Sequence, residues 1–387
     1  MTTVIANNIL EQLNTLILVV NELGRIEYVS PSSMRLLGYE PQALLGEGWW
    51  DLTRKNRHER FVSKTEVLSL LRTRKAFQPL SFERALTASD GSLKWILWNV
   101  SYNEDRTLIG IGHDITARKQ VEFQLLEKNR ELQRKNTETL QSIQYAKRIQ
   151  DAVIQDPDVL KKYFADAFIL YKPRDVVSGD FYWFYKKGNK VFVAAVDCTG
   201  HGVPGAILSV IANGLIRDAV LKSGLEDPGD ILRFIDRELD KVLSKDDGSL
   251  AMADGMDISL AVVDTGTQTV SFAGAFRPLL LLRNSEITEY KGSRYPIGQY
   301  ENVVKQFDTT EIPIQSGDRI YLFSDGYVDQ FGGEKEKKLN RRGFYELLLS
   351  AQSMDMEEQK SFLDYALNNW KQDIEQTDDI LVMGIEI

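Results

Sequence analysis

Apolar and polar positions divide this chain of 387 residues into three stretches of different periodicity. In the first, residues 15–20 form a short apolar run, a turn follows at residues 21–24, and residues 25–29 alternate, which predicts a β-hairpin. Residues 30–33, Ser-Pro-Ser-Ser, are a start signal for a short helix. Further strands are predicted at residues 82–86, 94–100 and 108–114, so residues 1–118 are expected to form a mixed α/β domain.

The second stretch, residues 119–155, lacks glycine and proline and is rich in charged and amide side chains. A heptad register places Leu125, Leu132, Thr139, Ala146 and Val153 at d, and Asn129, Asn136, Ile143 and Gln150 at a. Asparagine at a weakens a coiled coil but fixes its register and favours two parallel strands. We therefore expect a coiled-coil linker through which the chain forms a homodimer. A single amphipathic helix packed on the next domain is the alternative.

In the third stretch, residues 156–387, strand-like runs alternate with longer helical segments. Strands are predicted at residues 191–196, 258–263, 269–273, 279–282, 319–323 and 380–385. Helices are predicted at residues 205–222, 231–243, 342–349 and 357–370. Together with the first stretch, this pattern predicts an α+β protein with two globular domains joined by a helix.

Composition narrows the function classes. The chain carries 47 basic and 56 acidic residues, a net charge of −9, which argues against a nucleic-acid partner because such binding needs clustered Lys and Arg. Its single cysteine, Cys198, excludes an internal disulfide and a zinc site built from several thiolates. The N-terminus lacks the pattern of a signal peptide, and the uncharged stretch at residues 198–216 is too short in its apolar part to cross a bilayer. We expect a cytoplasmic protein without a membrane span.

The candidate functional residues are five aspartates at predicted strand ends, most of them beside a glycine or a second aspartate. They are Asp180, Asp197, Asp325, Asp378 and Asp379. A single Asp-Gly after a strand is most often only a turn. Several carboxylates at the ends of neighbouring strands would converge, however, and would repel one another unless cations neutralised them. Oxygen ligands without thiolates favour Mg²⁺ or Mn²⁺ over zinc.

These aspartates lie in motifs of a known family. The motifs are, in chain order, residues 146–150 (AKRIQ), 171–182 (YKPRDVVSGDFY), 197–206 (DCTGHGVPGA), 255–257 (GMD), 323–326 (FSDG) and 377–379 (TDD). With them, the region from about residue 142 to 387 resembles the SpoIIE-like branch of the PP2C (PPM) metal-dependent serine/threonine phosphatases. The resemblance implies an α-β-β-α sandwich with two Mn²⁺ or Mg²⁺ ions at one edge.

The same resemblance implies a ligand set and a reaction. The metal ligands would be Asp180, Asp197, the backbone carbonyl of Cys198, Asp325 and Asp378, while Asp379 would support them without touching the ions. The reaction would be hydrolysis of phosphoserine or phosphothreonine in a protein. Two cations lower the pKa of a bridging water toward ~7, so that it attacks phosphorus at neutral pH without a covalent enzyme intermediate. The implied substrate is a small phosphorylated regulator, such as an anti-sigma-factor antagonist of the STAS type.

The chain departs from better-known relatives at two points. Eukaryotic members carry a histidine, with a proposed general-acid role, two positions after the aspartate that matches Asp197, whereas this chain has Thr199 there. His201 comes two residues later, and both proton transfer and a purely structural role in its Gly-His-Gly turn are open for it. The phosphate-binding arginine of those relatives has no clear match. Lys172 and Arg174 lie near the corresponding place, but either could be a surface charge.

Residues 1–118 resemble a PAS sensor domain through the opening hairpin and short helix and the closing segment 110–119 (GIGHDITARK). The ligand of this domain is unknown. A flavin-adduct photosensor needs a cysteine, which residues 1–118 lack, and an axial haem ligand could come only from His58, in an apparent solvated loop, or His113. Four tryptophans could line a pocket or fill a small core: Trp49, Trp50, Trp95 and Trp98.

Taken together, the sequence predicts a PAS sensor (1–118), a helical linker (119–155) and a SpoIIE-type phosphatase domain (156–387). A catalytically inactive phosphatase fold that docks a partner in response to sensing is the alternative. The intact set of carboxylates favours the enzyme, because a scaffold would not need all of them.

Overall fold

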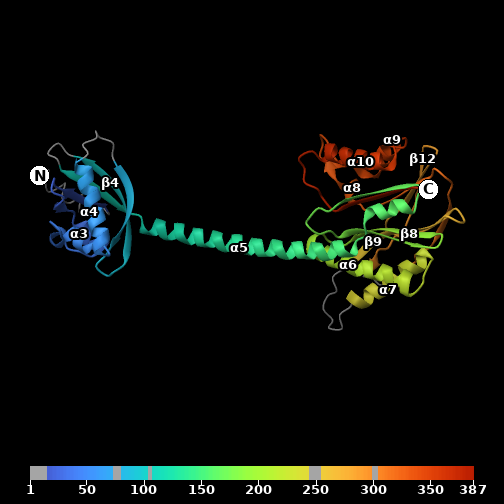
Figure 1. Cartoon of the computed structure of the whole chain (residues 1–387), viewed down its shortest axis with the longest axis horizontal. Coiled ribbons are helices and arrows are strands. Elements are labelled where there is room, and N and C mark those ends of the chain that lie inside the picture. The colour runs from blue at the N-terminus through green and yellow to red at the C-terminus, as the bar shows by residue number, and fades with distance from the viewer. Residues whose placement is uncertain (1–14, 73–79, 103–106, 244–253, 299–303) are drawn as a thin grey trace. The chain divides into compact units, whose positions relative to one another are not determined.

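The computed structural model describes residues 15–72, 80–102, 107–243, 254–298 and 304–387 (Figure 1). The chain forms two compact units, Met1–Asn136 and Thr137–Ile387. The N-terminal segment, in which we found no signal-peptide pattern, lies outside the described residues.

The N-terminal unit is an antiparallel sheet in the order β2-β1-β5-β4-β3. Its strands are β1 (Thr15–Val20), β2 (Ile26–Val29), β3 (Leu80–Thr87), β4 (Leu93–Tyr102) and β5 (Leu108–Asp114). Its helices are α2 (Ser32–Leu37), η1 (Pro41–Leu44), α3 (Gly48–Leu52) and α4 (Arg57–Arg72). The predicted hairpin, short helix and three later strands are all present, which confirms the expected α/β pattern.

Tryptophans form much of the core of this unit. The rings of Trp49 and Trp98 meet edge to face at 5.8 Å, and both side chains are buried. Gly112 makes room for this arrangement, because a Cβ atom there would lie 3.0 Å from the Trp98 ring. The sequence did not predict α4, and it placed His58 in a loop. His58 in fact lies in the first turn of α4, and its side chain is exposed.

The predicted linker is the long helix α5 (Thr116–Val153). The carboxylate of Asp114 accepts a hydrogen bond from the amide of Thr116 (2.8 Å) and so caps its start. Side chains at the d positions Leu125 and Leu132 are exposed, as a seam without a bound partner would be. The a-position side chain of Gln150 is buried and hydrogen-bonds to Ser178 within the C-terminal unit, so this end of α5 fits the alternative of a helix packed on the domain.

The described part of the C-terminal unit contains two large β-sheets, one of six strands and one of five. The first runs β14-β10-β9-β8-β7, with β13 paired to β9, and its strands are β7 (Asp180–Lys187), β8 (Lys190–Cys198), β9 (Gly255–Asp264), β10 (Thr269–Ala275), β13 (Ile297–Gly298) and β14 (Thr310–Pro313). The second runs β12-β11-β15-β18-β6, and its strands are β6 (Asp166–Lys172), β11 (Leu279–Arg283), β12 (Glu286–Tyr290), β15 (Arg319–Phe323) and β18 (Ile380–Glu386). A small hairpin joins β16 (Phe331–Gly332) to β17 (Lys337–Lys338).

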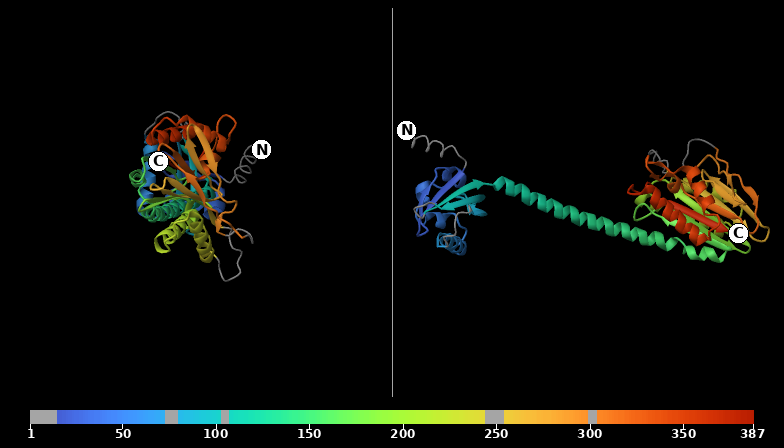
Figure 2. Two further views of the ribbon diagram at one scale, coloured as in Figure 1. Left: turned by 90° about the vertical axis from the view of Figure 1, so that its right-hand side faces the viewer. Right: turned by 90° about the horizontal axis from the view of Figure 1, so that it is seen from above.

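Helices cover the outer face of each sheet, so the unit has four layers. The helices α6 (Gly202–Arg217) and α7 (Pro228–Leu243) pack on the first sheet, and α9 (Asn340–Ser350) and α10 (Met356–Lys371) pack on the second (Figure 1). Seen from above, α10 lies across the strands (Figure 2). Separate apolar cores fill the space between the sheets and beneath each helical layer. This arrangement confirms the expected α-β-β-α sandwich. Shorter helices are η2 (Pro157–Lys162), η3 (Asp218–Lys222) and α8 (Gly326–Asp329).

The segment Gly202–Lys222, which is α6 continued by the π-helical η3, is long and apolar enough to cross a membrane by length and composition. We had expected the apolar part of this region to be too short. Half of the segment is buried in the unit, and Leu208, Ala212 and Ile216 belong to the core under the first sheet. Packing within the domain accounts for its apolar composition.

Candidate active site

Strand register brings three aspartates side by side at one edge of the first sheet. Asp180 on β7 pairs with Asp197 on β8, and Asp197 pairs in turn with Asp257 on β9. From the second sheet, Asp325 follows β15 and is the N-cap residue of α8, while Asp378 lies just before β18. The two sheets pack face to face, so these strand ends meet at a common edge.

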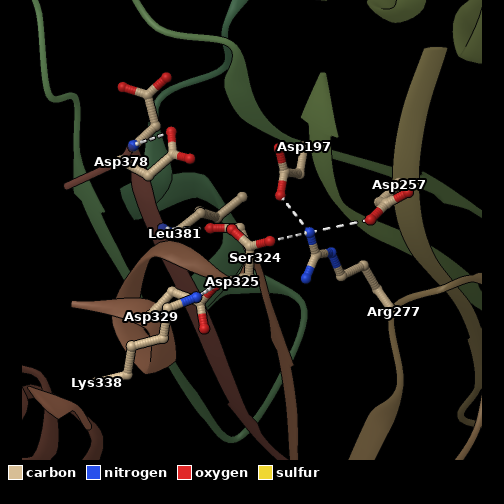
Figure 3. A network of polar contacts seen from close by, with 10 residues as sticks. Asp197, Asp257, Arg277, Ser324, Asp325, Asp329, Lys338, Asp378 and Leu381 are labelled. Carbon is tan, nitrogen blue, oxygen red and sulfur yellow. Dashed lines mark hydrogen bonds and ion pairs between the residues drawn. The ribbon is translucent and has the colours of Figure 1, made fainter. Parts of the chain in front are cut away.

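A guanidinium group lies in the middle of this cluster. Nη2 of Arg277 is 2.6 Å from a carboxylate oxygen of Asp197, 2.7 Å from one of Asp325 and 3.0 Å from one of Asp257 (Figure 3). Arg277 lies in the turn between β10 and β11, which belong to different sheets, and the residue before it, Phe276, has a positive φ of 58°. One cation therefore pairs with carboxylates from both sheets.

An open pocket of about 260 Å³ lies against this cluster. It is lined by Asp197, Cys198, Thr199, Gly200, His201, Asp257, Arg277, Asp325 and Asp378. The lining is thus mostly polar, with acidic groups on one wall and the exposed turn that carries His201 on another. A pocket of this kind suits a charged, hydrated group better than an apolar ligand.

Burial and mutual repulsion raise the pKa values of the carboxylates. Burial raises the pKa of Asp197 to about 7 against the opposing pull of Arg277, and it raises that of Asp257 to about 6 in the same way. For Arg277, burial disfavours the charged form, but the three carboxylates outweigh it and raise the pKa. The cluster therefore holds more negative charge than one guanidinium balances.

Asp180 lies deeper than the pocket lining. It is 2% exposed, and its Oδ2 atom is buried without a hydrogen-bond partner among the described residues. Burial, followed by repulsion from Asp197, raises its pKa well above the usual value. A buried carboxylate oxygen that accepts no hydrogen bond is energetically costly. We therefore expect a hydrogen-bond donor or a cation to contact this oxygen.

The buried side chain of Asp379 holds the loop that leads to Asp180. It accepts hydrogen bonds from the backbone amides of Arg174 and Gly179, both at 2.7 Å. Gly179 cannot be larger, because a Cβ atom would lie 2.6 Å from the carbonyl oxygen of Gly200 and 3.1 Å from that of Cys198. Asp379 therefore positions this loop against the loop that follows β8.

Cys198 and His201 lie on the pocket wall but differ in burial. The Cys198 side chain is buried in the apolar core, and burial raises the pKa of its thiol, so the thiol is neutral. The half-exposed imidazole of His201 is 2.9 Å, Nδ1 to Oδ2, from Asp175. This contact orients the ring and leaves Nε2 for other partners.

Whether these residues fit divalent ions depends on Arg277. Among the described residues, no three His, Cys, Asp or Glu side chains are arranged to hold an ion. The reason is visible in Figure 3, where the Arg277 nitrogen takes the point at which three carboxylates converge. The donors nevertheless fit hard cations, because all are oxygens, several are ionisable and one oxygen of Asp180 has no partner in the described part of the chain.

Sequence reasoning missed Arg277 and left Asp257 out of the proposed ligands. Asp257 carried a usable signal, since it opens a predicted strand within the GMD motif. Arg277 carried none, because it is far along the chain from the residues it contacts. Lys172, one of the two basic residues considered instead, pairs with Asp364 on α10, and neither it nor Arg174 lines the pocket.

Comparison with family models gives two matches. Residues 187–387 match the model described as stage II sporulation protein E (SpoIIE), and residues 10–120 match the model of the PAS fold. The comparison with curated proteins found no match.

Among solved structures, the C-terminal part is similar to the SiaA-PP2C domain of Pseudomonas aeruginosa, with 32% identity and a TM-score of 0.59 over 65% of this chain and 98% of that one. The RsbU and RsbW domains of Rv1364c from Mycobacterium tuberculosis match at 18% identity, with 57% of this chain and 59% of that chain covered and a TM-score of 0.46. The phosphatase domain of SpoIIE from Bacillus subtilis, solved with a fragment of its regulatory domain, matches at 16% identity, with 57% and 61% covered and a TM-score of 0.46.

Proposed function

This chain belongs to the SpoIIE family of PP2C-type serine/threonine phosphatases and carries a PAS domain in front, and from this premise we propose that it dephosphorylates a small regulatory protein under control of the PAS domain. The substrate would carry phosphoserine or phosphothreonine and would belong to the STAS-type antagonists of anti-sigma factors. The observation that carries the proposal is the convergence of carboxylates from two sheets on one pocket.

We assign the ion-binding role to Asp180, Asp197, the Cys198 carbonyl, Asp325 and Asp378. Divalent ions bound by these groups would ready a water for attack and offset charge on the phosphoryl oxygens. Two observations support this assignment: the Oδ2 of Asp180 has no hydrogen-bond partner in the described part of the chain, and repulsion from Asp325 and Asp257 adds to burial in raising the pKa of Asp197. Bound cations would relieve both. Asp379 would position Asp180 through the amide of Gly179.

Arg277 is our candidate for the contact with the substrate phosphoryl group, which sequence reasoning left unassigned. Its guanidinium is at the pocket wall, and its Nε is buried without a hydrogen-bond partner in the described part of the chain. The planar fork of an arginine suits phosphate oxygens. When cations hold Asp197 and Asp325, the Arg277 head group would be released from them to bind the phosphoryl oxygens.

Control by the PAS domain would act through α5. The buried amide of Gln150 donates to the carbonyl of Ser178 (2.6 Å) and to Oγ of Ser209 on α6 (2.9 Å), and it accepts from the amide of Ser178 (3.1 Å). Ser178 lies two residues before Asp180. A rotation of α5 would therefore shift the Asp180 loop, and a displacement of about 1 Å at a reacting centre can change a rate ~10²-fold.

The exposed apolar side chains of α5 support the dimeric linker that we expected. Leu125 and Leu132, at d positions, are exposed, and so are Leu126, Leu140 and further apolar side chains of the same helix. A second copy of the same helix, packed in parallel, would cover them. The oligomeric state of the full chain, measured by sedimentation, tests this part of the proposal by itself.

The activity is tested by Mn²⁺-dependent hydrolysis of p-nitrophenyl phosphate and of a phosphoserine peptide by the full chain. Asp197→Ala is expected to lower kcat on the order of 10²–10³-fold, as loss of one preorganised charge at a reacting centre does. Asp329→Ala is the matched control, because Asp329 pairs with Lys338 at 2.7 Å close to the cluster but does not line the pocket. Absence of Mn²⁺-dependent hydrolysis by all three proteins would favour the inactive docking module, in which Arg277 would pair with the carboxylates without ions.

Control through the linker is tested by insertions in α5 after Asn136. Each added residue rotates the following part of the helix by about 100° about its axis. An insertion of seven residues returns that part to within about 20° of its original orientation. We expect activity to vary with insertion length and to return at seven residues. A rate that is the same for insertions of one to seven residues would exclude control by helix rotation.

A further inference from the structure

The core of the PAS domain contains a small cavity of about 50 Å³. Most of its walls are apolar side chains from the sheet and from α4, and Trp49, Trp50 and Trp98 contribute their rings. At roughly 10–15 Å³ for each water-sized position, the cavity has room for about four such positions. It is therefore too small for haem or flavin, and neither His58 nor His113 lines it.

Two arginine side chains, Arg54 and Arg84, line this otherwise apolar cavity. Of the two, only Arg84 forms an ion pair with a carboxylate among the described residues. Arg84 pairs with Glu66 on α4. Arg54 instead donates from Nε to Oγ of Ser63 (3.0 Å) and from Nη1 to Oγ1 of Thr53 (2.8 Å), both neutral acceptors. Its Nη2 has no hydrogen-bond acceptor among the described residues, and no acidic side chain in the described ranges forms an ion pair with it.

Arg54 is also held in place by its surroundings. Its guanidinium lies over the rings of Trp49 and Trp50, with Cζ 5.9 and 5.6 Å from the two ring centres. Burial, assisted by the charge of Arg84 and opposed by the charges of Glu59 and Glu66, lowers the pKa of Arg54 to about 10. The cavity wall thus carries a guanidinium that forms no ion pair among the described residues, on a side chain held by two aromatic faces and three hydrogen bonds.

We infer that this cavity binds a short-chain monocarboxylate, whose carboxylate pairs with Arg54 and whose hydrocarbon part lies among the apolar side chains. One negative charge balances the one uncompensated guanidinium. A carboxylate is planar and accepts two parallel hydrogen bonds, which matches the fork of an arginine. The apolar walls offer little to a second charge, so a phosphate dianion would leave oxygens against hydrocarbon.

The first test is isothermal titration of the full chain with acetate, propionate and butyrate, each compared with its amide. The acid and the amide have almost the same shape, so their difference reports the charge. We expect at least one acid to bind saturably and at least ten-fold more tightly than its amide. Absence of saturable binding by all three acids through the millimolar range, or equal binding of acid and amide, would overturn the inference.

The second test uses Arg54→Met, which keeps much of the length of the side chain and removes the charge. We expect affinity for the tightest acid to fall at least ten-fold in Arg54→Met and to be partly kept in Arg54→Lys. Arg60→Met is the matched control, because Arg60 is a neighbouring arginine that pairs with Asp51 at 2.9 Å and does not line the cavity. Unchanged affinity in folded Arg54→Met protein would place the carboxylate elsewhere and contradict the inference, as would inorganic phosphate competing as well as the acid itself.

Discussion

Two partly buried arginines, one in each unit, differ in their electrostatic surroundings. Arg277 in the phosphatase domain touches three carboxylates, which raise its pKa in spite of burial. Arg54 in the PAS domain touches only hydroxyl and carbonyl oxygens and aromatic rings, and burial lowers its pKa to about 10. Both residues carry the same charged group, so the difference lies in the counter-charges that the fold provides.

The comparison indicates what kind of ligand each site favours. Around Arg277 three carboxylates contact one guanidinium, so further cations would be bound favourably. Arg54 forms no ion pair among the described residues, so an anion in direct contact with it would be bound favourably. A buried charge is stable only when it is paired, and the sign of the imbalance therefore predicts the sign of the ligand.

The strongest test of the comparison removes Arg277. Without added metal, Arg277→Met should lower the free energy of unfolding of the phosphatase domain by about 2–3 kcal/mol, less than for a fully buried ion pair, because three partly exposed carboxylates lose their counter-charge. Urea denaturation in a chelator measures this. Mn²⁺ should then reduce the deficit.

The control for Arg277→Met is Arg342→Met, which breaks an exposed pair with Glu346 within α9 and should change stability by about 0.3–0.5 kcal/mol. If Arg277→Met is as stable as the parent protein in chelator, the carboxylates do not depend on this guanidinium.

A second variant tests a buried carboxylate whose described partners are neutral. Asp379→Ala removes the acceptor for the amides of Gly179 and Arg174, so the loop before Asp180 should lose its position. We expect kcat to fall roughly 10–100-fold, as is typical when a residue that orients a metal ligand is removed. Steady-state rates at saturating Mn²⁺ measure this effect, with Asp329→Ala as the control, and an unchanged kcat would show that the loop keeps its position without Asp379.

A third variant tests the uncharged contact that joins α5 to the same loop. Gln150→Leu leaves the buried amide and carbonyl of Ser178 without their partners and should destabilise the phosphatase domain by about 1–3 kcal/mol. Gln144→Leu, at an exposed position of the same helix, should have little effect. Thermal unfolding compares the two, and equal melting temperatures would mean that the Gln150 amide does not hold the loop.

The smallest effect is expected in the PAS domain and has the opposite sign. Without a ligand, Arg54→Met should stabilise this domain by about 1 kcal/mol, because an uncompensated buried charge is replaced by an apolar side chain. Differential scanning calorimetry of the full chain in carboxylate-free buffer measures the change. A clear loss of stability would show that Arg54 serves packing alone.

Much of the fold was predictable because its elements are strongly patterned. Residues 319–323 were predicted as a strand and form β15 with the same bounds, since five consecutive positions suit a buried strand flanked by turn residues. The helix α4 was missed because its residues are mostly polar, and its weak apolar pattern resembles that of a loop. The contact of Gln150 with Ser178 was not predictable, because a heptad register describes one helix and carries no information about other elements that pack on it.

For the site, the sequence alone determined which residue types were available: acidic residues at strand ends, glycines beside them and the motifs of a phosphatase family. Only the tertiary structure decided that Asp257 lies beside Asp197, that Arg277 lies between three carboxylates and that Arg54 has no acidic partner in the described ranges. Strand propensity and motif spacing depend on neighbours along the chain. Charge pairing depends on distance in space, and that distance is set only when separate sheets and loops pack together.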